Sequence, residues 1–426
     1  MSRQALQKLG IVVTHLLKGN WAYVKPAAVK AWLKFQTCLF LPLGLLFVLA
    51  MRAARPLVLI RIGMLVSERL GHFAGNTELY LCEKDAGINT PKVSHVDIWY
   101  HNWPVSNRQL AKMWARVMHI WPAWLMAPTA KVNGWIPGGR AHVIAGTTCN
   151  DRDVHNLLDI SAPHLSFLPA EEARGQEGLR AIGIPQGAPF VCLNVRDDSY
   201  LRNALPWWNW SYHDYRNCDI QNYVLAAEEL TKRGYYVVRM GAAVNEAMRI
   251  SDPNPMVIDY AAKGLRSDFM DIYLGAHCAF CISNGTGFDA VPFIFRRPIV
   301  YVDHVPVGII ATFSPKFLAT TKKLRLRKEG RLMTFQEIFA SGAGHGMSSR
   351  EDGLGIDVDL IESTPQEVAA VVLEMEARQR GTWQTTDEDE ALQRRFWEIF
   401  PRNALHGEIR SRFGAEFLRQ NKALLN

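Results

Sequence analysis

The sequence contains few of the patterns that hold metal ions or read nucleic acids. Only seven of its 426 residues are cysteine, and of these only Cys278 and Cys281 have CxxC spacing. No second CxxC pair and no histidine pair completes a zinc site, so we expect buried thiols in a reducing compartment and no metal. The net charge of +7 is small for this length. It suits phosphate-bearing substrates or an anionic membrane surface but does not require a nucleic acid.

Known phosphate-binding fingerprints are missing as well. The chain has neither a Walker loop ending in Gly-Lys-Ser/Thr nor a GxGxxG dinucleotide motif, and it shows no internal repeat or low-complexity tract. These absences exclude the commonest nucleotide-binding signatures. They leave open phosphate sites formed by other loops.

Long apolar runs are scarce, with one exception near the N-terminus. The run Leu39 to Met51 reaches about 17 residues when Phe35 to Cys38 are added, the lower limit for crossing a bilayer. More than thirty residues precede it, which argues against a signal peptide. Aromatic and basic residues around it favour a helix lying in the headgroup region, whereas Pro42 and Gly44 are compatible with a helix packed on the protein itself.

Strands and helices are expected to alternate along most of the chain, which predicts an α/β fold with parallel sheets. At 426 residues, two domains are expected. We predict an N-terminal helical segment, an N-terminal Rossmann-like acceptor domain, a C-terminal Rossmann-like donor domain and C-terminal helices, over residues 1–55, 56–178, 185–385 and 386–426. The predicted strands cover 56–63, 95–99, 142–145, 190–195, 235–240, 257–259, 277–283 and 298–302. The predicted helices cover 108–117, 170–181, 220–233, 268–274 and 287–295, and a polar link over 169–187 joins the domains.

The most specific motif is CISNGTGFDAVPFIF, which starts at Cys281. A strand ends at Ser283, a glycine-rich turn follows, and a helix begins near Phe288. Free N–H groups at a helix start attract anions, and glycines allow close approach. We therefore predict a donor-phosphate site whose residues are Ser283, Gly285, Thr286, Gly287 and Asp289. The alternative is a structural turn capped by Thr286 or Asp289.

A second motif, FVCLNVRDDSY, begins at Phe190 and brings Arg196 to the end of a strand. A guanidinium there is suited to forked contacts with a diphosphate. The competing interpretation pairs Arg196 with Asp197 or Asp198 to hold the loop. Asn194 and Gly241, at the ends of two strands, are assigned to the same donor site. The aromatic loop over 207–219 either stacks on a base or sugar or packs between domains.

The third motif follows the first strand and includes Gly71, His72 and Asn76. We expect Gly71 and Asn76 on the acceptor side and His72 as general base, because histidine titrates near neutrality. A structural role for this histidine is the alternative. Glu68 and Asp97 are weaker base candidates. The acidic and histidine residues of DRDVHN, from Asp151, are expected to be solvated or to cap a turn rather than to bind a metal.

Together these motifs resemble a family of bacterial glycosyltransferases associated with cell-surface polysaccharide loci. The resemblance covers roughly residues 56–420. It rests on LVLIRIG, SERLGHFAGNTELYLCEKDAG, RDVHNLLD, VCLNVRDDSYL, WSYHDYRNCDIQNYVLAAEEL, RSDFMDIYLGAHCAFCISNGTGFDAVPFIF and RRPIVYV. The Ser-x-Gly-Thr-Gly turn is similar to the donor half of heptosyltransferases. Arg196 resembles the arginine of the fucosyltransferase His-x-Arg motif, which contacts the GDP diphosphate, with Asn194 in place of the histidine.

The resemblance implies a metal-independent transferase of the GT-B plan, with two Rossmann-like domains facing a cleft. Its partners would be a nucleotide-sugar donor and a lipid-linked or cell-surface glycan acceptor. It would need no cofactor beyond the nucleotide-sugar co-substrate and would contact the inner face of the bacterial cytoplasmic membrane peripherally. Two alternatives remain: a two-domain sugar-nucleotide epimerase, and a non-catalytic scaffold of a polysaccharide assembly complex.

Overall fold

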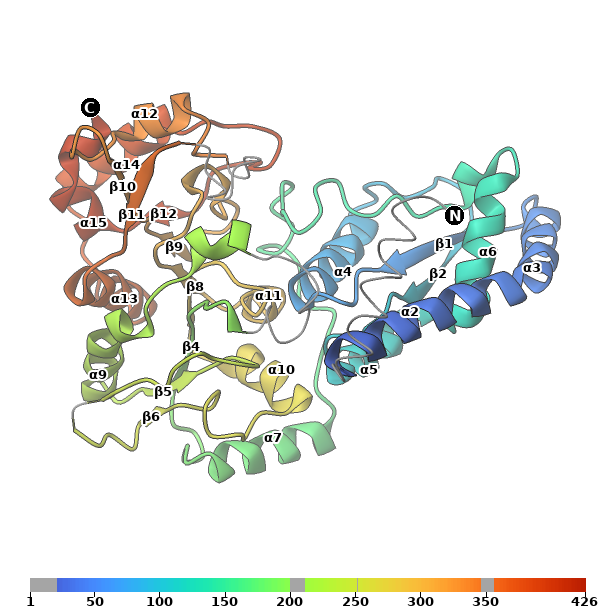
Figure 1. The fold of residues 1–426 in the computed structure, drawn as a ribbon, viewed down its shortest axis with the longest axis horizontal. Coiled ribbons are helices and arrows are strands. Elements are labelled where there is room, and N and C mark those ends of the chain that lie inside the picture. Colours follow the sequence, from blue (N-terminus) through green and yellow to red (C-terminus); the bar gives the residue numbers. More distant parts are fainter. Residues whose placement is uncertain (1–20, 200–210, 251, 346–355) are drawn as a thin grey trace.

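The computed structural model describes residues 21–199, 211–250, 252–345 and 356–426. It confirms the predicted mixed α/β fold, with two parallel sheets in two domains that lie side by side (Figure 1). The smaller sheet belongs to the N-terminal domain and the larger to the C-terminal domain. Helix α4 of the first domain packs against α11 of the second, so the domains meet between the two sheets (Figure 1).

The N-terminal sheet has three parallel strands in the order β1-β2-β3. Its strands are β1 (Leu59–Leu65), β2 (His95–His101) and β3 (His119–Ile120), and its helices are α4 (Leu70–Asp85), α5 (Arg108–Val117) and α6 (Ala123–Trp135). The expected strand over 142–145 is reduced to one parallel bridge between Val143 and Ile62. His142, just before it, ends a short 3-10 turn, Gly139–His142, which explains why the strand does not extend.

The C-terminal sheet has seven parallel strands in the order β12-β9-β8-β7-β4-β5-β6. They are β4 (Phe190–Asn194), β5 (Tyr236–Arg239), β6 (Val257–Ile258), β7 (Cys281–Ser283), β8 (Ile299–Tyr301), β9 (Phe317–Ala319) and β12 (Arg412–Phe413). Strands β10 (Lys323–Leu326) and β11 (Val358–Ile361) form a separate antiparallel pair. The helices are α7 (Pro169–Ala181), α9 (Val224–Lys232), α10 (Asp268–His277), α11 (Ala290–Ile294), α12 (Phe335–Ala340), α13 (Pro365–Gln379), α14 (Asp387–Ile399) and α15 (Ala415–Gln420).

The order of strands β4 to β9 fixes where a ligand can bind. Counted from β4, these six strands have the order 3-2-1-4-5-6, which is the doubly wound Rossmann arrangement. Strands β5 and β6 are added on one side of β4, and the chain then crosses to the other side of β4, where β7, β8 and β9 follow. In such sheets, ligands bind beyond the carboxyl ends of the two strands at this reversal. The structure therefore directs attention to the residues that follow β4 and β7.

The helix before β7 is longer than predicted, and β7 itself is shorter. Helix α10 continues to His277, with Ser267 as its N-cap, so β7 starts only at Cys281. Cys278 ends the helix rather than lying in a strand. Five of the seven cysteines are buried, whereas Cys38 is exposed and Cys149 is half-buried.

The predicted link and the C-terminal tail are both part of the folded body. Helix α7 packs on α10, where a Cβ on Gly175 would collide with the ring of Tyr273, and Glu171 pairs with Arg116 of α5 at 2.9 Å. The tail contains the predicted helices but also β12, which pairs with β9 and extends the sheet. Its two residues were expected to be helical because Phe413 fits a helical spacing with Phe417.

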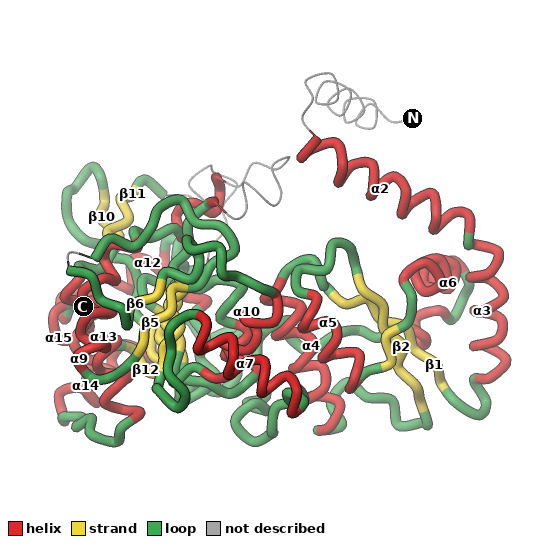
Figure 2. The backbone as a smooth tube through the Cα atoms, turned by 90° about the horizontal axis from the view of Figure 1, so that it is seen from below, coloured by secondary structure: helices red, strands yellow, loops and turns green. Residues whose placement is uncertain are grey.

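The N-terminal segment forms two helices, α2 (Trp21–Leu39) and α3 (Leu41–Ala54). Within the described ranges, no single helix is long and apolar enough to cross a membrane. The pair over 27–39 and 41–54, bent by 56°, meets that test only jointly. Figure 2 shows α3 lying beside α6, while α2, which also contacts α6, extends away from the body toward its N-terminal end.

Candidate donor site at the carboxyl ends of β4 and β7

The structure brings the two predicted donor motifs together. Asn194 at the end of β4 is the register partner of Ser283 at the end of β7. The Asn194 side-chain amide donates to the hydroxyl of Thr286. The backbone N–H of Arg196 donates to the side-chain oxygen of Asn284 at 2.9 Å. These contacts join the loops after β4 and β7 into one rigid edge.

The loop after β7 is held by the carboxylate of Asp289. Its Oδ2 accepts hydrogen bonds from the Ser283 hydroxyl at 3.0 Å and from the Thr286 N–H at 2.8 Å. The Ser283 hydroxyl in turn accepts from the N–H of Gly285 at 3.2 Å, and the N–H of Phe288 donates to Thr286 at 3.2 Å. Burial raises the pKa of Asp289 to about 6. Several N–H groups expected to bind phosphate are thus already occupied.

Helix α11 also differs from the prediction in a way that affects anion binding. It covers five residues, Ala290–Ile294, instead of the expected 287–295, and Pro292 lies inside it. So short a helix has too few aligned peptide groups to provide an anion site at its start. The predicted helix-terminus phosphate site is therefore corrected: the loop shapes the edge, and the positive charge has another source.

That source is a pair of arginines. The Nε of Arg196 is buried without a hydrogen-bond partner, and the structure gives this side chain no ion pair within the described ranges. Burial, together with the nearby charge of Arg216, lowers the pKa of Arg196 to about 10. Arg216 donates to the carbonyl of Gly285. Two cations thus lie near each other, with Asp214 and Asp197 in the vicinity but with no direct ion pair within the described ranges. Such a pair favours a dianion between the two guanidinium groups.

Burial, together with the positive charge of nearby arginines, lowers the pKa values of two histidines, His213 and His304. Burial, and then the charges of Arg196, Arg216 and Arg69, lower the pKa of His213 to about 4. Burial, followed by Arg216 and another arginine, lowers the pKa of His304 to about 3. Both rings are therefore neutral at pH 7, and the excess positive charge rests on the arginines.

Gly285 is needed for this packing. Its φ is +84°, and a Cβ there would lie 2.8 Å from the ring of His304. The predicted role of glycine, close approach, is thus filled by a protein side chain. Neither Arg216 nor His304 was singled out from the sequence. Arg216 lies in the loop that was interpreted for its aromatic residues, of which 207–210 are outside the described residues, as is Tyr200.

The acidic residues beside Arg196 have other partners. Asp197 accepts from the backbone N–H of Asn245 at 2.7 Å and of Ser199 at 3.0 Å. Asp198 accepts from the side-chain amide of Asn245 at 2.7 Å. This arrangement differs from the competing interpretation in which one of them pairs with Arg196. Gly241, with φ of +152°, opens the turn that carries Asn245.

A small pocket of about 200 Å³ lies beside these acids, between the ends of β4 and β5. Its lining includes Asp197, Asn217, Arg239 and Asn245. Arg239 is buried and paired with Asp259 at 3.0 Å. The pocket offers hydroxyl-binding groups directly next to the arginine pair.

The N-terminal domain approaches the same edge through the start of α4. A Cβ on Gly71 would lie 3.1 Å from the Cα of Gly287, so the predicted acceptor-side and donor-side glycines are in contact across the domains. No side chain caps this sixteen-residue helix at Arg69. Its positive end therefore adds to the field of the arginines. His72 is in the first turn, with Nδ1 3.3 Å from Oδ1 of Asn76.

The two weaker base candidates, Asp97 and Glu68, lie in different surroundings. Asp97 accepts from Arg61 at 2.7 Å and lies 3.4 Å from Lys84. Burial opposes its ionisation, but Arg61 and Tyr80 hold the pKa of Asp97 below its usual value, so this carboxylate is a structural partner and a poor base. Glu68 keeps one buried carboxylate oxygen without a hydrogen bond.

The DRDVHN segment binds its own backbone. Asp153 accepts from the N–H groups of Leu157 and Leu158 at 2.8 and 2.9 Å, the expected capping role. His155 contacts the hydroxyl of Thr148 at 3.0 Å.

Within the part of the chain that the structure describes, two groups of side chains have ligand-like spacing for a metal ion. One consists of Glu78, Cys82 and His164, and the other of Cys218, Asp303 and Glu362. Each already includes a cation. Arg296 lies 2.6 Å from Glu78, and Lys322 lies 3.1 Å from Glu362. Their negative charges are thus balanced by protein side chains.

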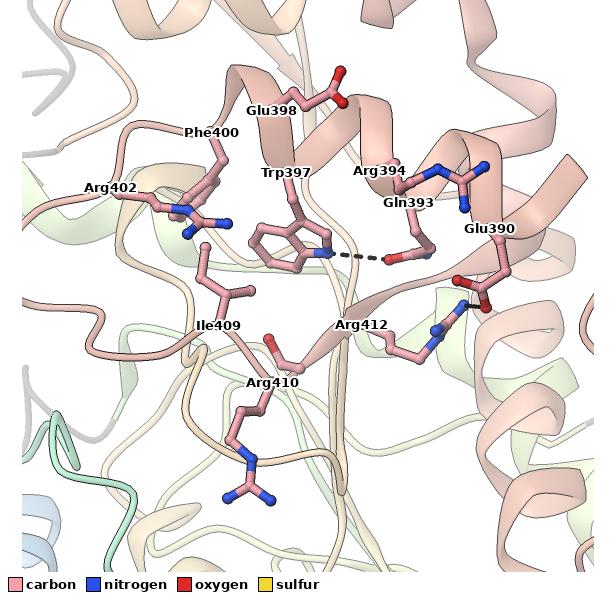
Figure 3. Close-up of a pocket in the computed structure, with 11 residues that line it drawn as sticks. Glu390, Gln393, Arg394, Trp397, Glu398, Phe400, Arg402, Ile409, Arg410 and Arg412 are labelled. Atoms are coloured by element: carbon pink, nitrogen blue, oxygen red, sulfur yellow. Dashed lines mark hydrogen bonds and ion pairs between the residues drawn. The ribbon is translucent and has the colours of Figure 1, made fainter. Parts of the chain in front are cut away.

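Another pocket, of about 680 Å³, is lined by residues of α14 and by the segment around β12 (Figure 3). Trp397 stands at its centre with its indole N–H directed to Gln393. Two of its arginines are paired, Arg410 with Asp159 and Arg412 with Glu390, both at 2.7 Å. It lies at the β12 edge of the sheet, away from the reversal between β4 and β7.

No protein-family model and no curated protein matches this sequence. Among solved structures, ADP-heptose lps heptosyltransferase II of E. coli is similar at a TM-score of 0.40 and 13% identity, covering 76% of this chain and 99% of its own. The family 9 glycosyl transferase of Veillonella parvula has a TM-score of 0.34 and 13% identity, covering 57% and 79%. A Listeria monocytogenes protein described as a UDP-N-acetylglucosamine 2-epimerase has 0.30 and 7%, covering 76% and 89%. At these values the similarities identify neither a family nor an activity for this chain.

Proposed function

We propose that this protein is a metal-independent GT-B glycosyltransferase that moves a sugar from a nucleoside-diphosphate donor to a hydroxyl of a lipid-linked or cell-surface glycan. The proposal rests on the arginine pair, Arg196 and Arg216, at the strand reversal of a Rossmann sheet. Within the described residues this pair has no carboxylate partner. Two adjacent guanidinium groups match the two charges of a diphosphate.

The other predicted donor residues support this site in different ways. Asn194, Ser283, Thr286 and Asp289 form the hydrogen-bonded frame that sets the loop conformation. Gly285 and Gly287 let the loop pack closely against its neighbours. Gly241 shapes the turn beside the small pocket, where we place the nucleoside.

In the proposed reaction, an acceptor hydroxyl oxygen attacks the anomeric carbon while the bond from that carbon to the diphosphate breaks. The hydroxyl proton passes to His72, and the nucleoside diphosphate leaves with an additional negative charge. Arg196 and Arg216, aided by the positive end of α4, stabilise that charge as it develops. Gly71 and Asn76 line the acceptor side. No cofactor takes part, and we place the reaction in the cytoplasm, at the inner face of the membrane.

A ligand screen tests this proposal. UDP-, GDP-, CMP- and dTDP-sugars are added to the full-length protein, and the melting temperature is recorded for each. We expect one nucleotide class to raise it, because ligands that bind only the folded state stabilise it. Failure of every nucleotide to bind would support the scaffold alternative.

A turnover assay then separates transfer from epimerisation. With the donor that stabilises the protein, free nucleoside diphosphate should be released only when a glycan acceptor is present. Recovery of an altered sugar still attached to its nucleotide, without acceptor, would contradict transfer.

A further inference from the structure

Helix α3 is fixed to the body of the N-terminal domain along one side. Gly44, Val48 and Met51 are buried, and a Cβ on Gly44 would lie 2.9 Å from the backbone of Pro128 in α6. Arg52 donates to the carbonyl of Pro137 at 2.9 Å. One side of α3 is therefore part of the folded N-terminal domain.

The other side of α3 continues into α2 as an exposed apolar stripe, which we call the outer stripe. Its residues recur every three or four positions across the bend, as on one face of a helix. It consists of Trp32, Phe35, Leu39, Leu43, Leu46 and Leu49, exposed by 39 to 63%. No residue of α2 whose burial is described is buried. Helix α2 contacts α6 and α3, but the residues of the outer stripe themselves remain exposed, so this face is available to an external partner.

Tryptophans from α6 and the turn before it border the stripe. Trp124 packs on Phe40 with ring centroids 5.1 Å apart, and Trp121 packs on Phe47 at 5.6 Å. Both indoles remain about 40% exposed. Tryptophan is favoured where one end of the ring is apolar and the other is wet, as at a membrane surface.

The helices that form and border the stripe contain no acidic residue. No aspartate or glutamate occurs before Glu68, or between Ile98 and Asn150, so α2, α3, α5 and α6 have no carboxylate. Basic residues flank the stripe, among them Lys34, Arg55 and Lys131. An all-basic rim around an apolar face complements anionic lipid headgroups. It opposes a symmetric pairing of two copies, which would bring cation against cation.

We propose that the outer stripe rests on the surface of an anionic bilayer, with α2 and α3 lying in the headgroup plane and the leucines entering the acyl boundary. The inference deepens the proposed function, and rests on it only in explaining how a lipid-linked acceptor reaches the enzyme. The surface itself is defined by exposure and charge alone.

Vesicle sedimentation tests this directly, with the full-length protein and no sugar donor. We expect sedimentation with phosphatidylcholine vesicles that contain phosphatidylglycerol, little with phosphatidylcholine alone, and release by high salt. Combining Leu46→Glu with Leu49→Glu should lower the partition coefficient at least about tenfold, because charges oppose entry into the acyl boundary. Ile160→Glu, at a residue 79% exposed outside the stripe, is the matched control and should bind like the wild type.

A second double variant tests the proposal in case the glutamate substitutions prevent folding. Trp32→Ala with Phe35→Ala removes apolar area from α2 and should weaken sedimentation while leaving the melting temperature unchanged. Equal binding to neutral vesicles, or undiminished binding by both double variants, would overturn the proposal. So would resistance to alkaline carbonate extraction, which indicates a span, or a wild-type dimer that the glutamates convert to monomers without any vesicle binding. Nucleotide affinity, measured separately, shows whether the proposed function stands when vesicle binding fails.

Discussion

Replacing Arg196 should raise the stability of the ligand-free protein while weakening donor binding. Burial lowers the pKa of Arg196 from its usual value to about 10. At about 1.4 kcal/mol per pKa unit, the charged side chain costs the fold about 3 kcal/mol at neutral pH. Arg196→Met keeps the apolar stem and removes the charge, so the free energy of unfolding should rise by up to that amount. For domains of this size, 1 kcal/mol corresponds to about 2–4 °C in melting temperature.

The same variant should bind the donor less well. Charge-assisted hydrogen bonds contribute about 1.5–3 kcal/mol, so the affinity for the nucleoside diphosphate found in the screen should fall by about ten- to a hundredfold. Arg196→Lys should restore only part of it, because a point charge cannot reproduce the planar fork. Thermal unfolding without ligand and titration calorimetry, on the same preparations, measure the two effects.

The control is Arg327→Met, since Arg327 is 58% exposed and pairs with surface aspartates. It removes the same charge far from the strand reversal and should change neither quantity appreciably. Should Arg196→Met lower the ligand-free stability and leave affinity unchanged, Arg196 would be a structural cation and the donor site would have to be abandoned.

Three further substitutions probe the site. Gly285→Ala should lower the melting temperature and the nucleotide affinity more than Gly330→Ala does. Both glycines have positive φ, but only at Gly285 would a Cβ lie 2.8 Å from a ring, that of His304. Equal effects of the two substitutions would mean that backbone strain alone explains them. The pKa of Asp289 is raised to about 6 by burial, so its contribution favours folding below about pH 4 and is lost as pH rises through 6. Asp289→Asn should therefore reduce the fall in unfolding free energy between pH 4 and 7, and a slope equal to that of the wild type would contradict this pKa. His72→Gln should reduce turnover at least about a hundredfold without changing nucleotide affinity, whereas turnover near the wild-type value would exclude it as the base.

The sequence predicted that the two proposed donor motifs lie together, because this depends only on both motifs following parallel strands. Arg196 and Ser283 both follow short apolar runs, and the carboxyl ends of parallel strands meet at one edge. Pairing of neighbouring strands then brings Asn194 opposite Ser283. The meeting of these two loops at one edge of the sheet was therefore predictable.

The source of its positive charge was not. The sequence does not show that the N–H of Thr286 already donates to the carboxylate of Asp289, three residues away. Nor does it show that Arg216 reaches Gly285, 69 residues away in the chain. Such contacts follow from packing rather than periodicity. The two-residue strand β12 was missed for a similar reason, because two residues carry no alternation that distinguishes a strand from a helix.

The placement of β12 has a consequence for synthesis on the ribosome. All strands of the first sheet precede residue 121, apart from the bridge at Val143, so this sheet can be completed while most of the second domain is still untranslated. The second sheet remains without its edge strand until Phe413 has emerged. Domains generally fold as units in the order of translation. Until then β9 presents an unpaired edge, so we expect the partly synthesised C-terminal domain to be most exposed to aggregation at this stage.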